Sequence, residues 1–110
     1  MKIENINAIV TGGSSGLGKA TVEIILSNGG RVSIFDTQKE LGEELAYRKG
    51  KKCNFYHTDV TDELTLKKNI ETVEKQSGDI NLTVNCAGKA FRKKLLVKKN
   101  YIIRIVLKKQ

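Results

Sequence analysis

The chain has 110 residues with 20 Lys and Arg against 12 Asp and Glu, giving a formal net charge of +8. This length predicts one domain that buries a core without disulfides. Cys53 and Cys86 have no further Cys or His at metal-ligand spacing, so the sequence suggests neither a zinc site nor a disulfide framework. No apolar run approaches about 18 residues and no signal or transit peptide is recognisable. We therefore expect a soluble, intracellular protein in a reducing compartment.

The positive charge is concentrated near the C-terminal end. Residues 89–110 hold nine bases and no acid, whereas residues 1–88 hold 11 bases and 12 acids, a net charge of −1. We predict two parts, a near-neutral domain at 1–88 and a basic tail of unrelated character at 89–110. The abrupt change fits a changed reading frame, a retained intron or an alternative exon after Gly88. The alternative is a non-enzymatic module whose tail binds nucleic acid or a membrane surface.

Short β-branched and aromatic runs alternate with amphipathic stretches along the first 85 residues. They predict strands at 7–11, 31–35, 53–57 and 80–85 and helices at 16–28, 38–48 and 62–76. Thr61 is the candidate N-cap of the third helix, which Ser77 and Gly78 close. Strict alternation predicts an α/β fold: a partial Rossmann fold with a parallel sheet of about four strands, ordered 3-2-1-4, and helices on both faces.

Two readings of the tail remain open. Phe91, Leu95, Ile102 and Val106 can share a helical face, whereas residues 101–107 have strand propensity with lysines at both ends. Without further strands the sheet edge and nearby apolar surface would be exposed. We therefore expect self-association through that edge.

A glycine-rich turn joins the first predicted strand to the first predicted helix. Gly12 permits the tight turn, Gly16 lets the backbone approach a pyrophosphate, and Gly18 allows close packing of the helix. Free amides at the helix start, where the dipole is positive, then face the phosphates. The turn predicts that the chain binds the adenosine-diphosphate half of a dinucleotide.

Three side chains near this turn bear on which dinucleotide is bound. Ser14 and Ser15 either donate hydroxyl hydrogen bonds to it or only cap the local backbone. Asp36, 18 residues after Gly18, can accept hydrogen bonds from the adenosine ribose hydroxyls and would repel a 2′-phosphate. Its other reading is an N-cap of the second helix. We predict NAD as the cofactor.

These residues and two later motifs resemble the short-chain dehydrogenase/reductase family. Thr11, Gly12, Gly16 and Gly18 match its Thr-Gly-x-x-x-Gly-x-Gly motif. Asp59-Val60 is similar to the family's Asp-Val pair, whose carboxylate approaches the adenine amino group. The segment 85–88 is similar to Asn-Asn-Ala-Gly, with Cys86 as the second residue. The predicted cofactor-binding residues are Gly12, Ser14, Ser15, Gly16, Leu17, Gly18, Asp36, Asp59, Val60, Asn85, Ala87 and Gly88.

The resemblance implies hydride transfer between NAD and an alcohol or 3-hydroxyacyl substrate. Within the family, the segments 58–61 and 84–88 are similar to the 3-hydroxyacyl-CoA dehydrogenase branch, which makes a mitochondrial matrix location an alternative to the cytoplasm. The resemblance covers about the first third of a typical member.

The family's catalytic serine and Tyr-x-x-x-Lys pair are not found after Gly88. Tyr47 and Lys51 have the right spacing, but they precede the third strand, so we interpret the match as chance. His57 is expected to be a strand-end side chain, and Cys86 a packed residue instead of a nucleophile. We predict no catalytic and no metal-binding residue in this chain, and an incomplete enzyme.

Overall fold

The structure, a computed structural model, describes residues 2–86 and the backbone of residues 102 and 103. The elements in chain order are a 3-10 helix η1 (Ile3–Asn5), β1 (Asn7–Thr11), α1 (Gly16–Ser27), β2 (Arg31–Asp36), α2 (Lys39–Lys49), β3 (Cys53–His57), α3 (Glu63–Ser77), β4 (Leu82–Asn85) and β5 (Ile102–Ile103). The predicted α/β fold is confirmed, with helix and strand ends within two residues of expectation. Among the described helices, none is long and apolar enough to cross a membrane.

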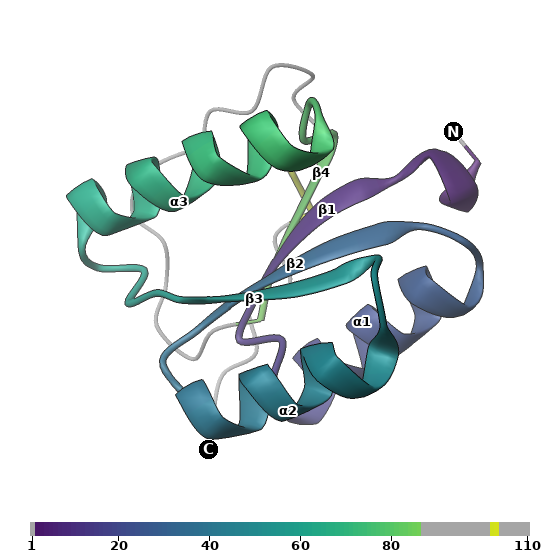
Figure 1. The fold of residues 1–110 in the computed structure, drawn as a ribbon, viewed down its shortest axis with the longest axis horizontal. Helices are drawn as coiled ribbons and strands as arrows, with labels where there is room; N and C mark the ends of the chain where they lie inside the picture. Colours follow the sequence, from purple (N-terminus) through teal and green to yellow (C-terminus); the bar gives the residue numbers. More distant parts are fainter. Residues whose placement is uncertain (1, 87–101, 104–110) are drawn as a thin grey trace.

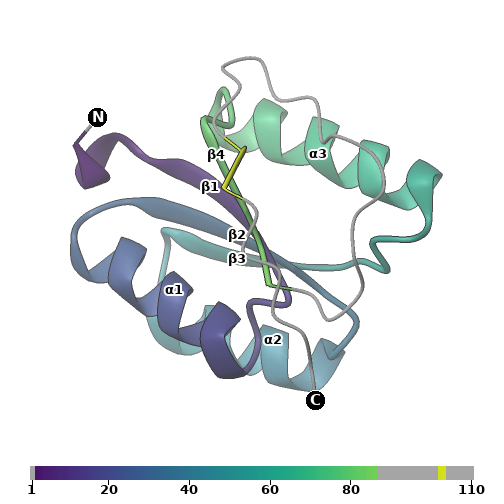
Figure 2. The ribbon, with the colours of Figure 1, turned by 180° about the vertical axis from the view of Figure 1, so that it is seen from behind.

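The strands form one parallel sheet in the order β3-β2-β1-β4-β5. The predicted order of the first four strands is therefore correct. Figure 1 shows α1 and α2 on one face of the sheet and α3 on the other. From behind, α1 and α2 lie beside each other (Figure 2), and an ion pair of 3.1 Å between Lys49 and Glu23 joins them. This doubly covered sheet is the partial Rossmann architecture.

A fifth strand adds to the expected sheet. Ile102 and Ile103 pair in parallel with Thr83 and Val84 of β4. For these two residues the prediction of a strand in the tail is confirmed. Residues 87–101 and 104–110 lie outside the described part, and with them Phe91, Leu95 and Val106 of the alternative helical face. The domain boundary after residue 88 therefore stays a prediction.

Alternation along β1 divides the core between the two faces. The larger cluster, on the side of α1 and α2, includes Ala8 and Val10, and the smaller one, under α3, includes Ile9. All three side chains are fully buried. Because a parallel strand covered on both faces buries every side chain, β1 reads as an almost continuous apolar run.

The predicted N-cap of α3 is wrong. The helix starts one residue later, and Asp62 is the N-cap, with its carboxylate accepting from the Thr65 backbone N–H and hydroxyl. Thr61 is engaged elsewhere, because its N–H and hydroxyl both donate to Oδ1 of Asp59, at 2.9 and 2.7 Å. The Asp59 turn thus sets where α3 begins.

Asn7 connects the opposite end of α3 to the sheet. Its Nδ2 donates toward the carbonyl oxygens of Ser77, Gly78 and Asp79 at 3.1–3.2 Å. Those carbonyls lie where a helix leaves its last acceptors without intrahelical donors. The side chain at the start of β1 therefore holds α3 against its face of the sheet.

Candidate functional site

The predicted site residues gather at the carboxyl edge of the sheet. The glycine-rich turn follows β1, Asp36 ends β2, and Asn85 ends β4. These three strands are adjacent, with β1 in the centre. In an open parallel sheet ligands bind outside the carboxyl ends of the strands, where the strand order reverses. Here that point lies between β1 and β4.

The glycines at the ends of the turn have the backbone conformations that the motif needs. Gly12 and Gly16 have positive φ angles of 68° and 59°, which side chains rarely allow. A Cβ added at Gly16 would have no atom within 4 Å, so the backbone here borders open space. This leaves the first turn of α1 accessible to a ligand.

Gly18 and Gly13 serve the packing beneath the turn. A Cβ on Gly18 would lie 1.9 Å from the carbonyl oxygen of Gly12, so only glycine lets the helix start this close to the turn. A Cβ on Gly13 would lie 3.0 Å from Ile34 and 3.2 Å from Val22. No packing role was predicted for Gly13, because the family motif leaves that position unspecified.

The two serines of the turn do not cap α1 through their side chains. Ser15 is the N-cap residue but makes no side-chain cap hydrogen bond, and its Oγ accepts from Nε2 of Gln38 at 3.2 Å. Ser14 is buried, and its hydroxyl has no hydrogen-bond partner among the described residues. A buried hydroxyl without a partner carries a desolvation cost that a ligand atom can remove.

Asp36 accepts hydrogen bonds from two backbone N–H groups, one in the glycine-rich turn and one in the loop before α2. Its Oδ2 accepts from the N–H of Ser14 at 3.1 Å, and its Oδ1 accepts from the N–H of Gln38 at 3.2 Å. The N-cap of α2 is Gln38, so Asp36 does not cap that helix. A carboxylate accepts about four hydrogen bonds, so beside these two donors from the described residues it has capacity for two more.

Asn85 is linked to the glycine turn through Thr11. The Thr11 hydroxyl donates to Oδ1 of Asn85 at 2.6 Å, and the Cys86 N–H donates to the Thr11 carbonyl at 3.0 Å. Both side chains of the Thr11–Asn85 pair are buried. The end of β4 is thereby locked to the end of β1. Ala87 and Gly88 lie outside the described residues.

Asp59 and Val60 are placed farther from the turn, after β3 and two strands away from β1. Asp59 is exposed and Val60 is half-buried. The Asp59 carboxylate shapes the start of α3 through Thr61, as described above. Its predicted contact with adenine stays a prediction.

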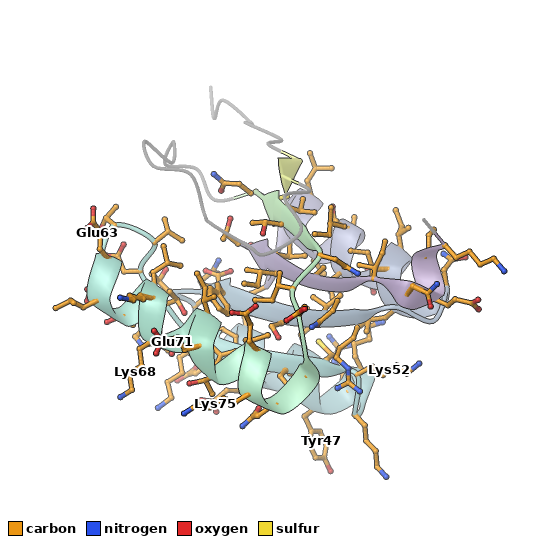
Figure 3. The ribbon with its side chains drawn as sticks, turned by 90° about the horizontal axis from the view of Figure 1, so that it is seen from above. Tyr47, Lys52, Glu63, Lys68, Glu71 and Lys75 are labelled. Atoms are coloured by element: carbon orange, nitrogen blue, oxygen red, sulfur yellow. The ribbon has the colours of Figure 1, made fainter. Side chains whose placement is uncertain are left out.

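The remaining candidate side chains lie at separate places in the structure. Tyr47 is 90% exposed, and Figure 3 shows it pointing away from the body of the molecule. Lys51 follows α2, in the loop that leads to the start of β3. His57 is the exposed last residue of β3. Burial raises the pKa of the Cys86 thiol, although a hydrogen bond with Thr21 opposes the shift. A thiol with a raised pKa is a poor nucleophile.

Comparison with known proteins agrees with this geometry. The family model "short chain dehydrogenase" matches residues 6–105. The chain is 41% identical over 88 residues to 3-hydroxyacyl-CoA dehydrogenase type-2 of Drosophila melanogaster, covering 80% of this chain and 34% of that protein. It is 37% identical over 87 residues to (+)-borneol dehydrogenase 1 of Salvia officinalis, and this match covers 79% of this chain and 34% of that protein.

A solved structure, that of 3-hydroxyacyl-CoA dehydrogenase type-2 from Mycobacterium avium, superposes with a TM-score of 0.72 at 36% identity. The superposed region covers 80% of this chain and 34% of the chain in that structure. The chain belongs to the short-chain dehydrogenase family and spans about a third of the length of these relatives. Its described part is the nucleotide-binding portion of that oxidoreductase fold.

Proposed function

We propose that this chain binds NAD through the turn between β1 and α1 and the carboxylate of Asp36. The observation that carries this proposal is the position of Asp36, which ends β2 and accepts hydrogen bonds from both Ser14 and Gln38. Its carboxylate stands directly beside the backbone that would hold the pyrophosphate. The family supplies the cofactor class, a nicotinamide dinucleotide.

The residues present fit such a ligand. Gly16 borders open space, the first amides of α1 have no intrahelical acceptor, and the buried Ser14 hydroxyl has no partner among the described residues. An anion at a helix N-terminus is stabilised by those amides and by the helix dipole. Gly16, Leu17 and Gly18 would therefore hold the pyrophosphate, and Asp36 the adenosine ribose.

The choice of NAD over NADP rests on charge. A 2′-phosphate carries negative charge and offers only acceptors, so it would meet the carboxylate of Asp36 without a proton to share. Ser15, the N-cap residue of α1, is neutral and gives a phosphate no cation. Free ribose hydroxyls, in contrast, can donate to the two acceptor positions that Asp36 keeps.

When bound, NAD supplies the acceptor for a hydride, and in the relatives named above the reaction is that of a dehydrogenase. In the 110 residues here, no Tyr-x-x-x-Lys pair follows Asn85. We therefore propose that this 110-residue polypeptide binds the cofactor without oxidising an alcohol or a 3-hydroxyacyl thioester. The role of its own residues is to bind and orient the adenosine half.

The test is a binding titration with NADH and NADPH for the wild type and for Asp36→Ala. The wild type is expected to bind NADH roughly tenfold or more tightly than NADPH, and Asp36→Ala to lose most of that preference. Asp79→Ala is the matched control, because Asp79 follows α3 at the amino edge of the sheet. Equal affinities of the wild type for both dinucleotides would refute the choice of NAD.

A further inference from the structure

We propose that Gln38 is a positioning residue for the adenosine ribose, held in place by Ser15. This inference rests on the proposed binding of NAD. It starts from a hydrogen bond between residues that are 23 positions apart: Nε2 of Gln38 donates to Oγ of Ser15 at 3.2 Å. Gln38 is the N-cap residue of α2, and Ser15 is that of α1. The bond therefore connects the starts of two neighbouring helices.

This bond completes a ring around the carboxylate of Asp36. The Gln38 N–H donates to one carboxylate oxygen, and the N–H of Ser14, next to Ser15, donates to the other. Asp36 is only 8% exposed, so its orientation is set by these neighbours and not by water. Breaking the bridge between Gln38 and Ser15 removes the direct side-chain link between the loop before α2 and the glycine turn.

The bridge also determines which hydrogen-bonding groups Gln38 and Ser15 present beside Asp36. With its nitrogen bound to Ser15, the Gln38 carboxamide keeps its oxygen as an acceptor, and the Ser15 hydroxyl keeps its proton as a donor. Both groups are neutral. This pairing suits a ligand with free hydroxyls and offers no cation to a phosphate group. Gln38 therefore reinforces the preference that Asp36 sets.

The test is the Kd of NADH for Gln38→Ala, Ser15→Ala and the double variant, with NADPH measured in parallel. Each single variant is expected to raise the Kd of NADH roughly two- to tenfold, the effect of one lost hydrogen bond. The double variant is expected to match the weaker-binding single variant, because either substitution alone removes the bridge. The Kd of NADPH is expected to change less, so the ratio of the two affinities falls.

Gln76→Ala is the matched control. It removes the same side chain and a similar exposed hydrogen bond, that between Tyr56 and Gln76, but from α3. Its Kd for NADH should equal the wild-type value. All four variants are expected to melt at the wild-type temperature within about 2 °C, since an exposed hydrogen bond contributes little to stability.

Gln38→Ala binding NADH as tightly as the wild type would overturn the role of Gln38 and leave NAD binding intact. Fully additive effects of the two substitutions would also overturn it, because they would show that the residues act separately. Failure of the wild type itself to bind NADH would refute the proposed function, and the role of Gln38 with it.

Discussion

At the residue scale, the buried polar side chains of β1 and β4 differ in whether their hydroxyls are paired. Thr11 donates to Asn85 at 2.6 Å, whereas the hydroxyl of Thr83 has no partner among the described residues. Both threonines are at least 98% buried. A buried hydroxyl stabilises the fold only when it has a hydrogen-bond partner, so the same substitution at the two positions should change the stability by different amounts.

Thr11→Val is expected to destabilise the fold by about 1–3 kcal/mol, because it leaves the Asn85 amide oxygen without this donor in a buried position. Thr83→Val, the matched variant, removes an unpaired hydroxyl and should leave stability unchanged or raise it by up to about 1 kcal/mol. Urea unfolding of both variants measures the difference. Equal losses for the two would contradict the roles that the structure gives these hydroxyls.

Individual residues show where the sequence suffices for prediction and where it does not. The roles of Gly12 and Gly16 follow from a local motif, because the demand for positive φ arises within the turn. The bridge between Gln38 and Ser15 does not, since it joins residues whose proximity exists only once β1 and β2 are paired. The contact of Asn7 with the end of α3 is of the same kind.

At the element scale, the turn between β1 and α1 combines two different requirements for glycine. Gly16 needs its backbone angle and has open space beside it, whereas Gly18 needs the absence of a Cβ. The two positions therefore require glycine for different physical reasons. Alanine substitutions at each test this distinction.

Gly16→Ala is expected to cost roughly 1–2 kcal/mol of stability, from the positive φ, and to weaken NADH binding through its Cβ at the phosphate position. Gly18→Ala is expected to cost about 3 kcal/mol, because its Cβ would meet the Gly12 carbonyl and must force α1 away from the turn. Thermal unfolding and NADH titration of both variants measure these effects. A stable Gly18→Ala protein with wild-type affinity would contradict the packing described.

The start of α3 gives a prediction for acid solution. Hydrogen bonds from the side chain and the backbone of Thr65 hold the pKa of Asp62 below its usual value of 3.8. A carboxyl group with a lowered pKa in the folded state stabilises the fold above its unfolded pKa, and this contribution is lost as the pH falls through the folded pKa. The stabilising effect of Asp62 should therefore be present at neutral pH and fade below about pH 4.

Asp62→Ala is expected to melt a few degrees below the wild type at pH 7 and to approach it in acid. Asp62→Asn, which retains a capping side chain without the charge, should lose less at pH 7 and show none of this pH dependence. Melting curves between pH 7 and pH 2.5 compare the three proteins. An Asp62→Ala protein that melts with the wild type at pH 7 would show that Asp62 does not cap α3.

The elements themselves were predictable because each carries its own signal. The strands of a doubly covered sheet are apolar and β-branched, and Gly78, with a φ of 83°, ends α3 where the sequence places the stop. The start of α3 was not predictable, since Thr61 and Asp62 are both good N-cap residues. The choice between them was made by Asp59, which binds Thr61.

At the scale of the whole molecule, two features favour contact between copies of the chain. Leu17 and Ile24 on α1 are 52% and 60% exposed, and the sheet in the described residues ends at a strand of two residues. These features support self-association of the chain.

Sedimentation analysis should give a weight-average mass that rises with concentration above the monomer value of 12.2 kDa. Ile24→Lys is expected to reduce this rise, and Leu64→Lys, on the far face of the sheet and also exposed, to leave it unchanged. A mass that stays at the monomer value over the whole concentration range would contradict self-association.

We propose above all that the turn between β1 and α1, with Asp36, binds the adenosine half of NAD. The most direct measurement is a titration of the ¹⁵N-labelled chain with NADH, followed through its backbone amide resonances. We expect the largest chemical-shift changes at Gly12–Gly18 and around Asp36, with little change at the amino edge near Asn7. Unchanged resonances in the turn at millimolar NADH, or changes confined to the amino edge, would contradict it.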